Sequence, residues 1–207
     1  MREVAYILTG WLLGLFSPWF AEQIQRPSKK SQIRTGIFVE LEGLRAKLAS
    51  VVLSVGAHVG ELDGETLRWF REVMKDDKFI KELSDPRFEQ LSQLDDQSIR
   101  DLSRAHAAPS TQSLTFKRYS LPYLEAHLSE LSLFSEEFQR LAHQIRDRLT
   151  IFNQQIDISW FYFQKTFDSS LSDLNRNLIA QNQDASQRLI SRLARLICDD
   201  IQAILQI

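Results

Sequence analysis

Glycine, proline and cysteine are all scarce in this chain. Its 207 residues include 7 glycines, 5 prolines and a single cysteine, Cys198. So few residues suited to sharp turns favour long helices over a sheet of many strands. A lone cysteine excludes an internal disulfide framework and is typical of proteins in a reducing compartment. The composition therefore predicts an all-α protein that does not depend on disulfides.

Sequence motifs of the common catalytic and nucleotide-binding sites are also missing. Neither GxGxxG nor GxxxxGK(S/T) occurs, so the chain lacks a glycine-rich phosphate loop of these two kinds. No Ser-His-Asp or Cys-His arrangement stands out at local spacing. The formal net charge of −2 gives no general attraction to nucleic acid. We therefore expect no enzyme activity, no cofactor, no small-molecule substrate and no nucleic-acid partner. A membrane-bound enzyme with dispersed catalytic residues remains an alternative.

Two small groups of residues come closest to a metal-binding or reactive pattern. His127 and Glu130 lie three positions apart, the reverse of the Glu-x-x-His spacing in carboxylate metal sites of helical bundles. A di-metal site would need a second such pair and further carboxylates, so we expect no bound metal. Cys198 precedes Asp199 and Asp200, and neighbouring carboxylates disfavour the reactive thiolate. We therefore expect Cys198 to be a packed thiol.

Charge is absent from one long segment near the N-terminus. Residues 4–21 form a run of 18 residues without a single charged side chain. As a helix, this run would measure about 27 Å, close to the bilayer hydrocarbon core of about 30 Å. Tyr6 and Trp19 stand near its ends, where amphipathic rings favour the headgroup region. The segment predicts a single transmembrane helix within a membrane anchor, residues 1–26.

Positive charge is concentrated directly after this segment. Only Arg2 precedes it, whereas four basic residues follow it: Arg26, Lys29, Lys30 and Arg34. By the positive-inside rule, the short N-terminus is predicted to lie outside and the body in the cytoplasm, as in a bacterial inner-membrane protein. The same four side chains are predicted to contact anionic headgroups at the membrane surface.

Three other interpretations of the uncharged segment remain open. A secretory signal peptide cut after Ala21 would need a small residue at position −3, where the chain has Trp19. A buried or partner-docked helix is compatible with the short length. An interfacial helix would need a polar face, which the segment lacks. If the segment does span a membrane, the GxxxG spacing of Gly10 and Gly14 predicts self-association of two such helices.

The body of the chain, residues 27–207, carries apolar residues at helical spacing. Long helices are predicted over three segments: about 28–62, 135–167 and 172–206. The last two must fold back as an antiparallel hairpin because their link is so short. Short helices and loops are expected over 63–134. The sequence thus predicts an elongated antiparallel helical bundle with coiled-coil packing and short peripheral helices.

Each long helix has a predicted buried stripe. The first runs through Ile33, Ile37, Leu41, Leu44, Leu48, Val52, Val55, Val59 and Leu62. The second runs through Phe138, Leu141, Ile145, Leu149, Phe152, Ile156, Trp160, Phe163 and Phe167. The third runs through Leu171, Leu174, Leu178, Ala185, Leu189, Leu193, Leu196 and Ile204. All three follow steps of three and four, with some positions skipped in the third, as expected for helices that bury one face.

Aromatic residues cluster near the end of the second long helix: Trp160, Phe161, Tyr162, Phe163 and Phe167. Four consecutive aromatic residues point to all sides of a helix, so a single core cannot easily bury them all. One interpretation is a junction where two packing surfaces meet. The other is a partner, oligomer or membrane-contact surface, because exposed apolar patches usually mark interaction sites. We take this cluster as the candidate interaction site.

The leading hypothesis is a single-pass membrane protein whose cytoplasmic bundle acts as a non-enzymatic interaction or assembly module. Its expected partners are the lipid bilayer and either a second copy or another protein. The alternative is an oligomerising membrane effector or regulator of a bacterial defence or toxin-type system. The spacing of Gly10 and Gly14 and the short, aromatic-rich anchor favour this alternative.

Overall fold

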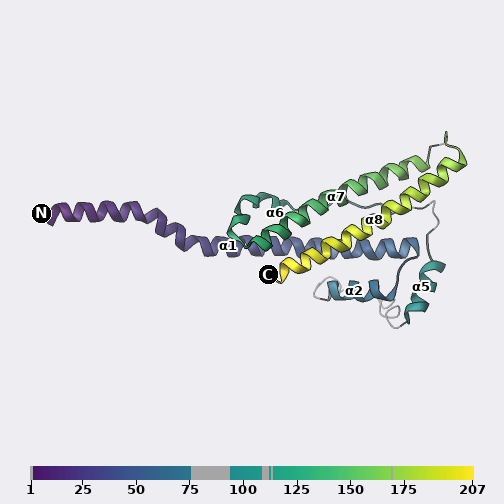
Figure 1. Cartoon of the computed structure of the whole chain (residues 1–207), viewed down its shortest axis with the longest axis horizontal. Coiled ribbons are helices and arrows are strands. Elements are labelled where there is room, and N and C mark those ends of the chain that lie inside the picture. The colour runs from purple at the N-terminus through teal and green to yellow at the C-terminus, as the bar shows by residue number, and fades with distance from the viewer. Residues whose placement is uncertain (1, 76–93, 109–111, 113, 169) are drawn as a thin grey trace.

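The computed structural model of the chain consists mainly of three long helices (Figure 1). It describes residues 2–75, 94–108, 112, 114–168 and 170–207, and for residues 2–26 it describes the backbone. The long helices are α1 (Arg2–Val59), α7 (Glu136–Thr166) and α8 (Asp173–Leu205). The short elements are α2 (Gly64–Met74), α5 (Asp96–Ala105), α6 (Pro122–Ala126) and the 3-10 helix η1 (Leu128–Leu133). The described residues contain no strand, which confirms an all-α helical bundle.

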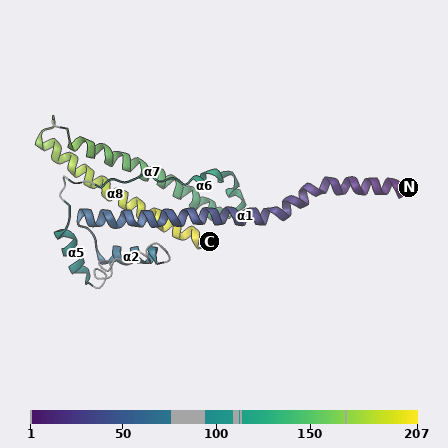
Figure 2. The ribbon, with the colours of Figure 1, turned by 180° about the vertical axis from the view of Figure 1, so that it is seen from behind.

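Helix α1 is continuous through Pro27, and its N-terminal part projects beyond the other elements in both views (Figures 1 and 2). The predicted anchor, residues 4–21 with Gly10 and Gly14, lies outside the residues whose side chains are described, as does Arg26. Among the residues that the structure describes in full, no helix is both long enough and apolar enough to cross a bilayer.

The core lies where α1, α7 and α8 pack together. Along α1, the predicted stripe is buried from Ile33 to Val55, and along α7 it is buried from Phe138 to Ile156. The Phe38 ring of α1 stacks on the Phe138 ring of α7, with centroids 6.2 Å apart. Burying one such apolar side chain stabilises the fold by about 1.5–3 kcal/mol. The buried stripes therefore supply most of the attraction between the helices.

Serine side chains define where the two hairpin helices begin. The Phe138 backbone N donates to Ser135 Oγ at 3.3 Å, and the Asn175 backbone N donates to Ser172 Oγ at 3.4 Å. Each hydroxyl satisfies an amide that has no partner inside its own helix. Between the helices, Ser170 donates through Oγ and N to Asp168 Oδ1 at 2.6 and 3.0 Å. These bonds lower the pKa of Asp168 and tighten the link.

The buried face of α8 differs from the predicted one. Five residues of the predicted stripe are exposed: Leu174, Leu178, Ala185, Leu189 and Leu196. Of the predicted stripe, Ile204 is buried, and the other buried residues are Gln183, Ser186, Gln187, Ile190, Ala194, Ile197, Cys198, Asp200 and Ile201. Helix α8 therefore has two apolar faces, and the isoleucine-rich face is the one that packs in the core. The prediction was wrong because the leucine-rich face has equally regular helical spacing.

One carboxylate holds α6 against α1. The Glu40 side chain accepts hydrogen bonds from the backbone N of Tyr123 at 2.8 Å and of Leu124 at 2.9 Å. Both amides belong to the first turn of α6, where they have no partner within the helix. The N-cap residue Leu121 offers no side-chain hydrogen bond, so Glu40 takes over the capping role from another helix.

Two glycines of α1 have different surroundings and allow a matched test. A Cβ at Gly36 would lie 2.2 Å from Tyr123 Cζ, whereas one at Gly43 would meet nothing within 4 Å. The Tyr123 ring stacks on His127 at a centroid distance of 4.3 Å, which limits its retreat. We expect Gly43→Ala to raise the free energy of unfolding by about 0.5–1 kcal/mol and Gly36→Ala to lower it by about 1–3 kcal/mol. Denaturant unfolding followed by circular dichroism measures both changes, and equal stabilisation would show that the ring moves aside freely.

Candidate interaction surface

Helices α7 and α8 extend past the point where α1 ends. Phe38 of α1 stacks on Phe138 of α7, and the two helices run in the same direction (Figure 1). Equal numbers of residues counted from this stacked pair reach about equal heights along the two helices. Helix α1 ends at Val59, 21 positions after Phe38. The residue 21 positions after Phe138 is Ser159, the last buried residue of α7. Beyond this level the hairpin continues without α1. We call this part the hairpin tip, residues 160–168 and 170–182.

The hairpin tip exposes most of the aromatic cluster. Trp160, Phe161 and Phe167 have 47%, 54% and 72% of their surface exposed, while Tyr162 and Phe163 are partly buried. Phe167 lies on the core-facing side of α7 and is exposed because α1 has ended before this level. Phe161 lies two positions after the buried Ser159 and points away from the core. On the α8 side of the tip, two further apolar side chains are exposed: Leu174 and Leu178.

The exposed rings contact one another. The Trp160 and Phe163 centroids are 5.4 Å apart, and the Phe163 and Phe167 rings meet edge to face at 5.0 Å. The Lys165 ammonium lies 5.9 Å from the centroid of Phe161. Such tilted and edge-to-face contacts are favourable and restrict the ring orientations while leaving the outer ring surfaces open. The tip therefore presents a preformed aromatic patch.

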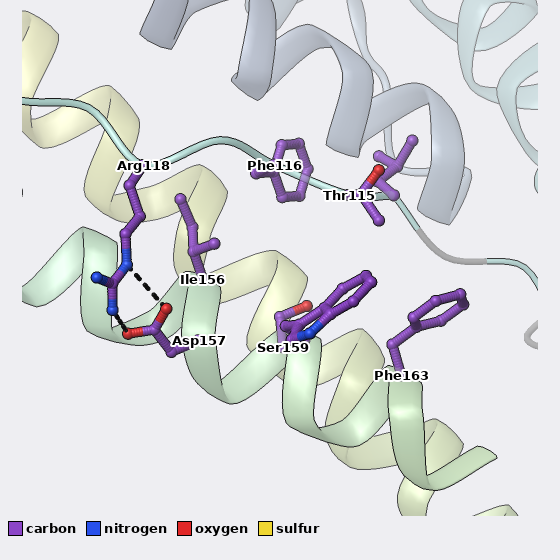
Figure 3. Close-up of a pocket in the computed structure, with 9 residues that line it drawn as sticks. Thr115, Phe116, Arg118, Ile156, Asp157, Ser159 and Phe163 are labelled. Atoms are coloured by element: carbon purple, nitrogen blue, oxygen red, sulfur yellow. Dashed lines mark hydrogen bonds and ion pairs between the residues drawn. The ribbon is translucent and has the colours of Figure 1, made fainter. Parts of the chain in front are cut away.

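A groove of about 190 Å³ lies beside this patch, between α7 and the non-helical segment 114–121 (Figure 3). The ion pair of Arg118 and Asp157 stands at one end of the groove, and the Phe163 ring stands at the other (Figure 3). The remaining lining residues are Leu114, Thr115, Phe116, Ile156, Ser159 and Trp160. Because Trp160 and Phe163 belong to both the tip and the groove, the two form one continuous surface.

One asparagine fixes the non-helical segment to α7. Asn153 Oδ1 accepts from the Tyr119 backbone N at 3.0 Å, and Asn153 Nδ2 donates to the Tyr119 carbonyl at 2.7 Å. The Tyr119 ring packs against Phe152 with centroids 6.0 Å apart, and its burial raises the pKa of the phenol. Arg118 Nε donates to Asp157 Oδ1 at 2.9 Å. That ion pair is exposed and adds at most about 1 kcal/mol, so Asn153 and Tyr119 carry most of the attachment.

A polar layer closes the core directly beneath the tip. Ser159 of α7 and three residues of α8 are buried there: Gln183, Ser186 and Gln187. Gln155 Nε2 donates to Ser186 Oγ at 2.6 Å, whereas Gln183 Nε2 has no hydrogen-bond partner among the described residues. A buried donor left unsatisfied costs about 1–3 kcal/mol. This end of the core is therefore held less strongly than the isoleucine-rich part below it.

The predicted membrane-contact residues lie at the opposite end of the bundle, where α1 enters it (Figure 1). Each of the three described cations has a partner in the body: Lys29 with Glu130 at 3.6 Å, Lys30 with the Phe134 ring at 5.6 Å, and Arg34 with the Phe38 ring at 4.9 Å. Lys29 and Lys30 remain exposed. The length of the bundle thus separates this basic group from the aromatic patch.

The residues considered for metal binding and thiol chemistry are engaged elsewhere. The described residues bring together no group of three His, Cys, Asp or Glu side chains that could hold a metal ion. His127 Nδ1 lies 2.8 Å from the Tyr123 carbonyl oxygen, and Glu130 pairs with Lys29. The groove at the tip is lined mainly by apolar and aromatic side chains, together with the ion pair of Arg118 and Asp157.

No family model, curated protein or solved structure matches this chain. The geometry of the tip and groove is thus the basis for a functional proposal. The aromatic cluster was predicted from the sequence, whereas Phe116, which also lines the groove, and Asn153, which holds the groove's wall to α7, were not. Leu114 and Phe116 alternate weakly in the sequence, but their contact with α7 joins segments about 40 residues apart and has no local signal.

The attachment of the non-helical segment can be tested at Asn153. Asn153→Ala removes both hydrogen bonds to the Tyr119 backbone, so we expect the free energy of unfolding to fall by about 1–3 kcal/mol. Amide hydrogen exchange at Tyr119 should accelerate in the same variant. The exposed neighbour provides the control, since Gln154→Ala should change the free energy by less than about 0.5 kcal/mol. Unchanged exchange at Tyr119 would contradict the role of Asn153.

The burial of Cys198 in the core can be tested through the reactivity of its thiol. Its thiol is 1% exposed, and burial, followed by the charge of Asp199, raises its pKa to about 12. Because the thiolate is the nucleophile, both the raised pKa and the burial of Cys198 make its thiol unreactive near neutral pH. We expect maleimide to label it in guanidinium but not in the native protein, whereas an added cysteine in Val39→Cys should label at once. The raised pKa favours folding while the thiol is protonated, so this contribution declines as pH rises from 9.0 towards about 12.

Proposed function

We propose that this chain is a membrane-anchored, non-enzymatic docking protein. In this proposal residues 4–21 cross the bilayer, the short N-terminus lies outside and the bundle lies in the cytoplasm. The uncharged segment, the basic residues after it and the projecting N-terminal part of α1 support the anchor. The observation that carries the docking role is the exposed aromatic patch, continuous with a groove, at the far end of the hairpin.

The position of the tip determines what it can contact. The part of α1 from Pro27 to Val59 contains 33 residues, which is about 50 Å of helix. The basic group lies at the anchored end of this rod, and the hairpin tip lies at the other end (Figure 1). The proposed anchor would therefore hold the aromatic patch well away from its own membrane. This separation favours a protein partner over lipid as the ligand of the patch.

The size and chemistry of the groove indicate what part of a partner it would take. Its volume of about 190 Å³ is below the range of about 300–1,000 Å³ typical of small-molecule sites. Such a groove suits one large apolar side chain, with neighbouring partner residues resting on Trp160, Phe161 and Phe167. Exposed aromatic residues of this kind are frequent energetic centres of protein interfaces. We infer that the partner presents an apolar segment of a second protein species.

A second candidate function, the oligomerising membrane effector, also has a specific observation in its favour. Helix α8 has a leucine-rich face that no element within the described part of the chain covers. Together with the Gly10 and Gly14 spacing, this face supports self-assembly in the membrane plane. In that case Gly10→Leu combined with Gly14→Leu should abolish any toxicity caused by overexpression.

The docking role can be tested by recovering the partner. The full-length chain, tagged at its C-terminus, is extracted from its native membranes in mild detergent, captured and analysed by mass spectrometry. We expect a second protein to co-elute in a fixed ratio. The double variant Trp160→Asp, Phe167→Asp should lose at least about 90% of it, because two hot-spot rings are worth roughly 2 kcal/mol or more each.

Val39→Asp replaces an equally exposed apolar residue on α1, away from the tip, and should retain the partner. Equal loss from both variants would show that added charge, and not the patch, determines binding. Retention by the double variant would remove the tip from the interface. Recovery of the untagged or tagged chain only in the high-speed supernatant would overturn the anchor.

A further inference from the structure

The leucine-rich face of α8 has the spacing of a second helix-packing seam. Positions 182, 185, 189, 192, 196, 199 and 203 follow steps of three and four along this face, and all of them are exposed. Apolar residues fill four of these positions: Ala185, Leu189, Leu196 and Ala203. A repeat of alternating three- and four-residue steps is the pattern by which one helix packs along another. Helix α8 therefore carries a packing face in addition to the one buried in the core.

Helix α7 has matching exposed residues, Ile151 and Ile158, which are seven positions apart. Ile151 lies six positions after the fully buried Ile145, and Leu196 lies six positions after the fully buried Ile190. At 100° per residue, the side chains of Ile151 and Leu196 point about 120° away from the core direction of their helices. Both point towards the side where α7 and α8 meet. The two sets therefore border the line of contact between α7 and α8 on the face opposite α1.

We call this surface the outer seam, and it consists of Ile151, Ile158, Ala185, Leu189, Leu196 and Ala203. Its four large side chains are 50%, 43%, 42% and 45% exposed for Ile151, Ile158, Leu189 and Leu196 respectively. A helix with apolar residues on more than one side is usually covered on each of them. The described part of the chain supplies no element that covers this seam.

We propose that the outer seam binds the outer seam of a second copy of this chain, related by a twofold axis parallel to the bundle. In this arrangement α7 of each copy packs against α8 of the other, so that the two hairpins form a four-helix bundle. The two α1 helices lie on the outside and leave the assembly at the same end. The inference rests on the proposed function in one respect, because anchors in one membrane require this parallel orientation.

The hydrogen bonds within the hairpin determine which residues would meet. Gln144 bonds to Asp200 at 3.1 Å, and Gln155 bonds to Ser186 at 2.6 Å, so these pairs mark equal heights along the hairpin. Ile151 lies between the two glutamines, at the height between Leu189 and Leu196. A twofold axis parallel to the helices leaves heights unchanged. Ile151 of one copy would therefore pack between Leu189 and Leu196 of the second copy, beside the aliphatic part of Arg192.

Charges on and beside this face favour the same pairing, and on α8 they occupy two of its seven positions, Arg192 and Asp199. From the anchored end, α7 carries Arg140 and then Asp147, whereas α8 carries Asp199 and then Arg192, and all four are exposed. By the two marker bonds, Asp199 of one copy would lie at a height between Arg140 and Asp147 of the second copy, and Arg192 would lie a little beyond Asp147. Each of these two α8 side chains therefore has an opposite charge within about one helical turn. A direct parallel pairing of α8 with α8 would instead place Arg192 against Arg192 and Asp199 against Asp199. Charge order thus favours contact between α7 and α8 of different copies.

Cross-linking between two differently tagged full-length chains in membrane vesicles tests this arrangement. One chain carries Ile151→Cys and the other carries Leu196→Cys, and a short bis-maleimide is the probe. We expect a product containing both tags, because the two positions face each other across the dimer. Val39→Cys on both chains is the matched control and should give none. The native Cys198 is buried and should not react.

A second variant tests whether the seam itself holds the dimer. Ile158→Glu with Leu189→Glu, added to both cysteine-bearing chains, should weaken dimerisation about 100-fold and remove the cross-link. Both residues are exposed in the single chain, so the helix content and melting temperature should stay close to those of the parent. A cross-link no stronger than the Val39→Cys control, or one that survives the two glutamates, would overturn the proposal.

The seam dimer and the docking role of the tip can fail independently, and the experiments distinguish the two failures. If the seam cross-link forms but no second protein depends on Trp160 and Phe167, the dimer stands and the docking function falls. If the partner binds through the tip while the seam gives no cross-link, the docking function stands and the dimer falls. A dimer that forms only through Gly10 and Gly14 would also leave the seam without a cross-link, and would count against it.

Discussion

The difference in length between α1 and the α7–α8 hairpin is the constraint on which the rest of this structure depends. Helix α1 stops because Gly60 adopts a φ of +71°, a left-handed conformation that glycine takes readily, and the Glu61 backbone N donates to the Gly56 carbonyl at 2.9 Å. A Cβ at Gly60 would also lie 2.9 Å from the Cβ of Ala107. Since the chain turns away here, the hairpin continues alone and its aromatic residues stay uncovered.

Two uncovered apolar surfaces result from this architecture, and they differ in position and chemistry. The tip is an end surface, made of rings that contact one another and border a groove. The outer seam is a side surface, made of aliphatic residues in a regular repeat along two helices. An end surface can reach a separate protein without involving the rest of the bundle, whereas a long regular seam is matched best by another helix pair of the same length. The two surfaces can therefore be occupied at the same time.

Sequence periodicity predicted the helices well because caps and apolar spacing are local properties. Ser135 and the stripe from Phe138 to Ile156 illustrate this for α7. Periodicity could not decide which face of α8 is buried, since its leucines and isoleucines are both regularly spaced and only the neighbours choose between them. It also could not find Asn153 or the groove, because these depend on a contact between α7 and a distant non-helical segment.

The polar layer at Gln155, Ser159 and Ser186 divides the hairpin into two parts with different tolerance to sequence change. Below the layer, every turn contributes side chains to a three-helix core, so an insertion or deletion would shift packed residues out of register. Above it, α1 is absent, and beyond Phe163, the last α7 residue that lines the groove, the described hairpin consists of two helices and a short link. Whole turns can be added to or removed from both helices there without altering the core. The tip is therefore the part of the fold in which hairpin length and surface chemistry can diverge freely while the supporting bundle stays the same.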